Sequence, residues 1–156
     1  MNVICFGDSN TYGYDPRSYL GGRYAADSQW VDILAEKTGW TVRNLGENGR
    51  EIPSTAPNFP ADTDLLIVML GTNDLLQGRS PEQAAVSLKR FLSGISLNRS
   101  KILLIAPPPV KRGAWVPNQQ LIDDSRTFAQ LCHALAAQMG IRFADAGKWD
   151  IPLAYD

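Results

Sequence analysis

The chain has 156 residues, of which 44% are hydrophobic and 20% are charged, a composition typical of one globular domain with a buried core. Fifteen basic residues nearly balance 16 acidic ones, so the net charge of -1 gives no basis for binding nucleic acid or an anionic membrane surface. No apolar run is long enough to span a bilayer. We therefore expect a single domain over residues 1–156, located in the cytoplasm, with no nucleic-acid or membrane partner.

Short apolar runs alternate with longer amphipathic or polar stretches along the whole chain. The predicted strands are residues 2–6, 41–45, 65–70, 101–106 and 141–144. The third and fourth runs are apolar throughout, as expected for parallel strands that are buried on both faces. This alternation predicts an α/β fold in which helices cover a parallel sheet. We expect a three-layer α/β/α sandwich with a five-stranded parallel sheet, in the flavodoxin-like order 2-1-3-4-5.

Three helices are predicted between the strands, at residues 28–38, 80–95 and 118–139. The first and third end at Gly39 and Gly140, because glycine readily adopts the left-handed conformation that closes a helix. The second starts at Ser80, an N-cap residue that Pro81 follows at the first helical position. Cys132 in the third helix and Cys5 in the first strand fit buried reduced thiols better than a disulfide or a metal cluster.

The segments that follow the carboxyl ends of the strands are where we expect the chemistry, because open α/β sheets bind ligands at that edge. The segment after the first strand reads FGDSNTYG and presents Ser9 to an incoming substrate, with backbone N–H groups of the following turn near a developing oxyanion. The alternative is that Asp8 and Ser9 only cap a turn.

Two further motifs follow the second and third strands. NLGENGRE places Gly46 and Gly49 where a backbone N–H could face a substrate, although ordinary turn glycines would give the same pattern. LGTNDLL places Asn73 where its amide could donate to a tetrahedral intermediate, although a turn or helix cap would also explain it. The functional interpretation of each motif is supported by the presence of the other two.

GDS, G-x-x-G and GTND occur in this order, each after a different predicted strand. The combination resembles blocks I, II and III of the GDSL or SGNH hydrolases, over nearly the whole chain. The resemblance implies that Ser9 is the nucleophile and that the Ser9 N–H, the Gly49 N–H and the Asn73 amide form the oxyanion hole. The stretch from GDSNTYGYDP to GGRY is most similar to the arylesterase and acyltransferase-like branch.

The resemblance implies attack by serine, an acyl-enzyme, and hydrolysis by water or transfer to another alcohol, with no cofactor or metal. Such a serine needs an imidazole to accept its proton. The family's last block, Asp-x-x-His, is missing, and the one histidine, His133, lies inside a predicted helix, where we interpret it as structural or exposed. Asp156 fits the aspartate of that block, so we expect the C-terminal segment with the histidine to be lacking and this chain to be a weak esterase.

The leading functional hypothesis is a carboxylic-ester hydrolase for small molecules with short acyl chains, such as acetylated sugars or aryl esters, and a homo-oligomer is compatible with it. The alternative is a catalytically silent protein of the same fold that binds a ligand or another subunit. A flavodoxin-like nucleotide binder lacks support, because neither GxxxxGK[ST] nor GxGxxG is present. Trp115 could line a pocket or only pack, and we interpret Arg23, Arg50 and Arg112 as solvated side chains.

Overall fold

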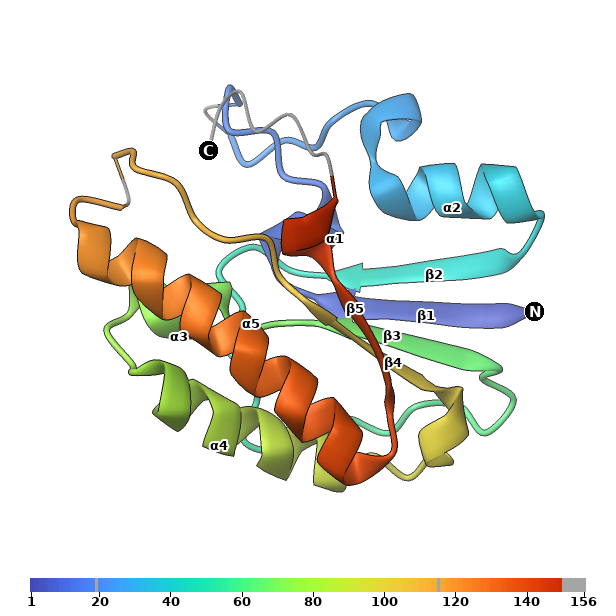
Figure 1. The fold of residues 1–156 in the computed structure, drawn as a ribbon. Helices are drawn as coiled ribbons and strands as arrows, with labels where there is room; N and C mark the ends of the chain where they lie inside the picture. Colours follow the sequence, from blue (N-terminus) through green and yellow to red (C-terminus); the bar gives the residue numbers. More distant parts are fainter. Residues whose placement is uncertain (19, 115, 150–156) are drawn as a thin grey trace.

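A parallel sheet forms the middle layer of the fold (Figure 1). The computed structural model describes residues 1–18, 20–114 and 116–149. The strands are β1 (Asn2–Gly7), β2 (Thr41–Gly46), β3 (Leu65–Met69), β4 (Ile102–Ala106) and β5 (Arg142–Asp145). All four pairings are parallel, and the order β2-β1-β3-β4-β5 confirms the predicted topology.

Successive side chains of the central strands point to opposite faces and enter two separate hydrophobic clusters. In β1, Ile4 and Phe6 belong to one cluster, whereas Val3 and Cys5 belong to the other. β3 is divided in the same way, and all five of its residues are buried. The continuous apolar runs in the sequence follow from this arrangement, because a strand covered on both faces has no solvent-facing side.

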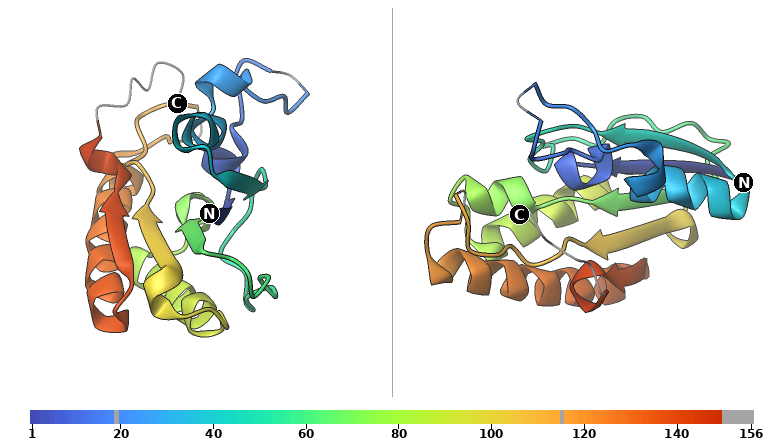
Figure 2. Two further views of the ribbon diagram at one scale, coloured as in Figure 1. Left: turned by 90° about the vertical axis from the view of Figure 1, so that its right-hand side faces the viewer. Right: turned by 90° about the horizontal axis from the view of Figure 1, so that it is seen from above.

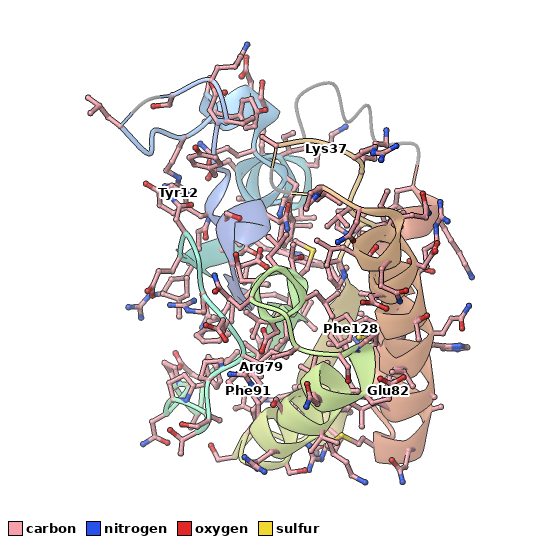
Figure 3. The ribbon with its side chains drawn as sticks, turned by 90° about the vertical axis from the view of Figure 1, so that its left-hand side faces the viewer. Tyr12, Lys37, Arg79, Glu82, Phe91 and Phe128 are labelled. Atoms are coloured by element: carbon pink, nitrogen blue, oxygen red, sulfur yellow. The ribbon has the colours of Figure 1, made fainter. Side chains whose placement is uncertain are left out.

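Helices cover both faces of the sheet, which confirms the predicted three-layer sandwich (Figure 2). α2 (Trp30–Thr38) lies on one face, and α4 (Pro81–Ser93) and α5 (Gln119–Met139) lie on the other. Figure 3 looks from the carboxyl edge toward the layer that contains Phe91 of α4 and Phe128 of α5, both fully buried. No helix in the described part of the chain has the length and apolar character needed to cross a bilayer.

The predicted helix caps are found in the structure, but α2 begins at Trp30 rather than at residue 28 and α4 ends at Ser93 rather than at residue 95. Ser80 forms a capping box with Gln83, in which each side chain accepts a hydrogen bond from the other residue's backbone N–H. Gly39 and Gly140 close α2 and α5 with φ angles of +67° and +65°, values that a residue with a Cβ rarely adopts. The two cysteines are buried free thiols, as expected, and burial raises the pKa of Cys5 to about 12.

Several short helical turns were not predicted. They are α1 (Ser9–Tyr12), η1 (Ala26–Ser28), α3 (Thr72–Leu76), η2 (Arg99–Lys101) and η3 (Ala146–Lys148). None is long enough to show the 3.6-residue apolar period that identifies a helix in sequence. Two of them matter for function, because Ser9 lies on α1 and Asn73 lies on α3 rather than in loops.

Candidate active site

The candidate site lies at the carboxyl edge of three neighbouring strands. Ser9 follows the end of β1, Gly49 follows the end of β2, and Asn73 follows the end of β3. Because β1 lies between β2 and β3, the serine occupies the middle of this edge with the other two residues on either side. The structure therefore brings together the three residues that the sequence motifs single out, at the edge where an open parallel sheet binds its ligands.

Ser9 is the first residue of α1, and Asp8 is the N-cap of that helix. The Oδ1 atom of Asp8 accepts a hydrogen bond of 2.9 Å from the backbone N–H of Asn10, which fixes the first turn. Ser9 itself is half-buried. Within the described residues, neither its Oγ nor its N–H has a hydrogen-bond partner, so both can serve a substrate.

Glycine allows α1 to pack directly on the backbone of β1 and β2. A Cβ on Gly46 would lie 2.1 Å from the backbone nitrogen of Tyr12, and a Cβ on Gly7 would lie 2.1 Å from Oγ1 of Thr11. The side chain of Asn44 donates to the carbonyl of Thr11 at 2.8 Å and accepts from the N–H of Gly46 at the same distance. Gly46 thus lies in β2 with its N–H already bonded, and its role is close packing.

Gly49 differs from Gly46 both in its packing and in the hydrogen bonding of its N–H. Its φ of +75° lies in the left-handed region that favours glycine, and it is exposed, with nothing within 4 Å of a Cβ built on its backbone. Its N–H makes no hydrogen bond to any described residue. An N–H near the end of β2 that has no partner among the described residues is suited to donate to a bound carbonyl oxygen.

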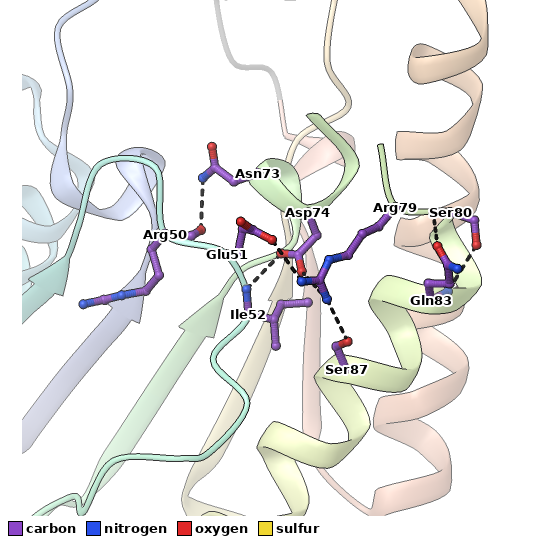
Figure 4. Close-up of polar contacts among 9 residues, drawn as sticks. All are labelled: Arg50, Glu51, Ile52, Asn73, Asp74, Arg79, Ser80, Gln83 and Ser87. Carbon is purple, nitrogen blue, oxygen red and sulfur yellow. Dashed lines mark hydrogen bonds and ion pairs between the residues drawn. The ribbon is translucent and has the colours of Figure 1, made fainter. Parts of the chain in front are cut away.

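Asn73 lies in the first turn of α3, and its side-chain Nδ2 donates a hydrogen bond of 3.0 Å to the backbone carbonyl of Arg50 (Figure 4). An amide nitrogen carries two hydrogens, so one N–H is used for this contact and the second remains for a ligand. The contact also fixes which end of the amide is the donor.

The position of α3 depends on a close contact with α5. Gly71, which precedes α3, has a φ of +120°, and a Cβ there would lie 2.2 Å from Cε1 of Phe128. No other residue fits in that space without moving the ring. The packing of α5 on the sheet therefore helps to set where Asn73 is presented.

Two carboxyl groups are fully buried beside the candidate site. Burial raises the pKa of Asp8 to about 6, and the nearby charge of Asp74 contributes in the same direction. Burial also raises the pKa of Asp74, whose Oδ2 accepts from the N–H of Ile52 at 2.9 Å. Neither acid was among the predicted site residues, although each lies next to one of them in the motifs GDS and GTND.

Arg50 is not the solvated side chain that we expected. Its Nη1 donates to the carbonyl of Gly7 at 2.9 Å and also to the carbonyl of Leu45, and its side chain is only 18% exposed. The sequence offers one signal for this role, namely that the arginine directly follows Gly49, but the contacts themselves come from segments far apart in the chain.

The one histidine of the sequence does not contact Ser9. His133 is exposed on α5, and its ring lies 4.9 Å from the ring of Phe143 on β5. α5 runs away from the carboxyl edge, and position 133 lies roughly 20 Å along the helix from its start at Gln119. This placement agrees with a structural or exposed histidine.

Two earlier expectations concern residues outside the described part of the chain, Asp156 and Trp115. A cavity of about 460 Å³ lies at the carboxyl edge beyond β4 and β5, between the segment that follows β4, the start of α5 and the segment that follows β5. Its lining includes Pro108, Arg112 and Trp149.

An accessible serine at the end of a central parallel strand, with free N–H donors on both sides, is the arrangement that a serine-dependent acyl hydrolase requires. The comparisons with known proteins agree. The GDSL-like lipase/acylhydrolase family matches residues 5–156, and the chain belongs to this family of carboxylic-ester hydrolases. A comparison with curated proteins gave no match.

Solved structures show the same fold. A proposed arylesterase from Agrobacterium tumefaciens is 28% identical with a TM-score of 0.75, and the alignment covers 94% of this chain and 83% of that one. A member of the lipolytic G-D-S-L family from Veillonella parvula is also 28% identical, with a TM-score of 0.66 and coverage of 93% and 77%. A carbohydrate acetylesterase family member from Sinorhizobium meliloti, 24% identical, has a TM-score of 0.75 and coverage of 94% and 83%.

Proposed function

We propose that this chain hydrolyses short acyl esters of small molecules, or transfers the acyl group, through an acyl-enzyme on Ser9. The observation that carries the proposal is the unbonded Oγ of Ser9 at the middle of the carboxyl edge, with the Gly49 N–H and the Asn73 amide on either side. The likeness to a proposed arylesterase at 28% identity supports an aryl ester as the substrate.

The proposed reaction has two steps. The Oγ of Ser9 attacks the ester carbonyl, the carbonyl oxygen gains negative charge, and the N–H groups of Ser9 and Gly49 and the amide of Asn73 donate to it. The bond to the alcohol then breaks, and the alcohol leaves with a proton. Water attacks the resulting acyl-serine and releases the carboxylic acid, or a second alcohol attacks it and a new ester forms.

The proton of Ser9 needs an acceptor, and His133 is too far along α5 to be that group. We propose that an imidazole supplied in solution can accept this proton. Oxyanion stabilisation and positioning alone can still give about 10³ to 10⁴-fold acceleration over water. Asp156 remains our proposed acid for orienting an imidazole at this site.

A cavity of about 460 Å³ lies at the same carboxyl edge as Ser9, beyond β4 and β5, and its volume is in the range of pockets for small ligands. We propose it as a subsite for part of a small substrate.

The test compares the wild-type chain with Ser9→Ala on p-nitrophenyl acetate, butyrate and octanoate, each with and without added imidazole. We expect turnover that depends on Ser9, increases with imidazole and decreases as the acyl chain lengthens. Acid-quenched samples should show the added mass of one acetyl group on the wild-type chain and none on Ser9→Ala. Equal rates for both proteins at every imidazole concentration would instead favour the catalytically silent alternative.

A further inference from the structure

We propose that Arg50 is a positioning residue that aims the Asn73 amide into the oxyanion hole without touching the substrate. The proposal rests on the proposed function of Ser9, Gly49 and Asn73. Arg50 contacts all three segments from which these donors come: the end of β1 before Ser9, the end of β2 before Gly49, and Asn73 itself. It does so with two different parts of the residue.

The guanidinium group joins the ends of β1 and β2. Its Nη1 donates to the carbonyls of Gly7 and Leu45, and its Cζ lies 4.4 Å from the centre of the Phe6 ring. A planar guanidinium can donate in several directions and stack on an aromatic face at the same time, which an ammonium cannot. The carbonyl of Gly7 also accepts from the N–H of Glu47 at 3.1 Å, so the turn that carries Gly49 is attached to β1 twice.

The backbone carbonyl of Arg50 faces the opposite way and accepts from Nδ2 of Asn73 (Figure 4). This contact leaves one Asn73 N–H for the oxyanion. If the carbonyl moved, the amide could rotate about its side-chain torsions and lose that direction. The position of the guanidinium therefore determines where the carbonyl lies, and the carbonyl determines how Asn73 is aimed.

Ile52, two residues after Arg50, is attached to α3 by a separate buried contact. Its N–H donates to Oδ2 of Asp74 at 2.9 Å. A substitution of Arg50 should therefore shift the carbonyl of residue 50, and with it the Asn73 amide, while the segment stays attached to α3.

The ion pair between Arg50 and Glu47 is not the basis of the proposed role. Its atoms lie 2.5 Å apart, but the Glu47 side chain is 66% exposed, and exposed pairs contribute little. The carbonyl contacts are the half-buried ones. This difference provides a control, because Glu47→Gln removes the ion pair and keeps the guanidinium on both carbonyls.

The kinetic test is a double-mutant cycle on p-nitrophenyl acetate in the presence of imidazole. Loss of one oxyanion donor lowers kcat by about 10² to 10³-fold, so Asn73→Ala sets the upper limit. Arg50→Met should lower kcat by roughly 10 to 100-fold and leave KM within about threefold, because only transition-state binding is affected. In the Asn73→Ala background, Arg50→Met should lower kcat by less than about threefold, since the two act through one donor.

Three further variants complete the kinetic test. Arg50→Lys keeps a cation near Phe6 and should recover part of kcat, whereas Glu47→Gln should stay near the wild type. Arg43→Met removes an exposed arginine from β2 and is the matched control for the substitution itself. Equal losses from Arg50→Met with and without Asn73, or a rise in KM alone, would overturn the proposal.

A second measurement does not depend on turnover. In amide proton–nitrogen correlation spectra, the side-chain signal of Asn73, assigned by its loss in Asn73→Ala, should shift or broaden in Arg50→Met and change less in Arg50→Lys. An unchanged Asn73 signal in both variants would overturn the proposal even if the wild type shows no esterase activity. If Arg50→Met does not fold, Arg50→Lys alone decides between these outcomes. Absence of Ser9-dependent turnover with a shifted Asn73 signal would count against the proposed function only.

Discussion

Replacing Asp8 with asparagine removes a charge from a fully buried carboxyl while preserving its shape and the oxygen that caps α1. Burial raises the pKa of Asp8 from 3.8 to about 6 in the folded protein. Between these two values the folded state binds a proton that the unfolded state has lost, so stability decreases as pH rises through this window. The contribution of Asp8 to stability is constant above the pKa of the folded state and below the pKa of the unfolded state.

The shift gives the expected magnitude. From pH 4 to pH 7.5, the two pKa values correspond to a loss of about 2 kcal/mol of wild-type stability from Asp8 alone. Asp8→Asn has no such titration. The free energy of unfolding of Asp8→Asn minus that of the wild type should therefore increase by about 2 kcal/mol between the two pH values. The amide also places an N–H where the Oδ2 of Asp8 has no partner, but that cost does not vary with pH.

Urea denaturation of both proteins at pH 4 and pH 7.5 measures this difference. Glu36→Gln, which neutralises an exposed carboxylate on α2, is the control and should change the difference by less than about 0.5 kcal/mol. A stability difference between Asp8→Asn and the wild type that is the same at both pH values would refute the reasoning. It would show that the carboxyl is solvated or paired in the folded protein.

Other predictions concern the site and its supports. Asn73→Ala should lower kcat on p-nitrophenyl acetate by about 10² to 10³-fold with little change in KM, and unchanged kcat would exclude the amide from the oxyanion hole. His133→Ala should leave Ser9-dependent turnover within about twofold, because an exposed side chain far along α5 does not reach the site; a loss above about tenfold would make it the base. Gly46→Ala should lower the free energy of unfolding, measured by thermal denaturation, by about 2 to 3 kcal/mol, because its Cβ would meet the backbone of Tyr12. Gly49→Ala should lower it by about 1 kcal/mol, because only the positive φ opposes the new side chain. Equal costs for the two glycines would contradict the packing argument.

The positions of the strands and of the main helices along the chain could be predicted because their signals are local and repeated. LLIVM and ILLIA are apolar at every position because both faces are covered, and Ser80 with Pro81 marks a helix start from residue type alone. Each predicted strand end lies within one residue of the observed end. The short helices α1 and α3 gave no periodic signal, so their caps could be suspected from Asp8 and Gly71 but their extent could not.

The contacts that organise the site could not be predicted from the sequence. Arg50 was interpreted as solvated because most loop arginines are, and only the fold brings the carbonyls of Gly7 and Leu45 to its guanidinium. In the same way, nothing near Gly71 in the sequence indicates that a phenylalanine 57 positions later occupies the space a Cβ would need. Such requirements are set by long-range packing, which a local pattern does not contain.

The placement of the three candidate donors on three strands also bears on how the protein folds. β1 pairs with β3 across about 60 positions of chain, and the donors meet only after that pairing and the pairing with β2 are both complete. Helices α4 and α5 can form early, because their contacts are local, whereas long-range parallel pairing is slow. During refolding, recovery of Ser9 reactivity should therefore lag behind recovery of helical structure, and the time between them measures the closure of the central sheet.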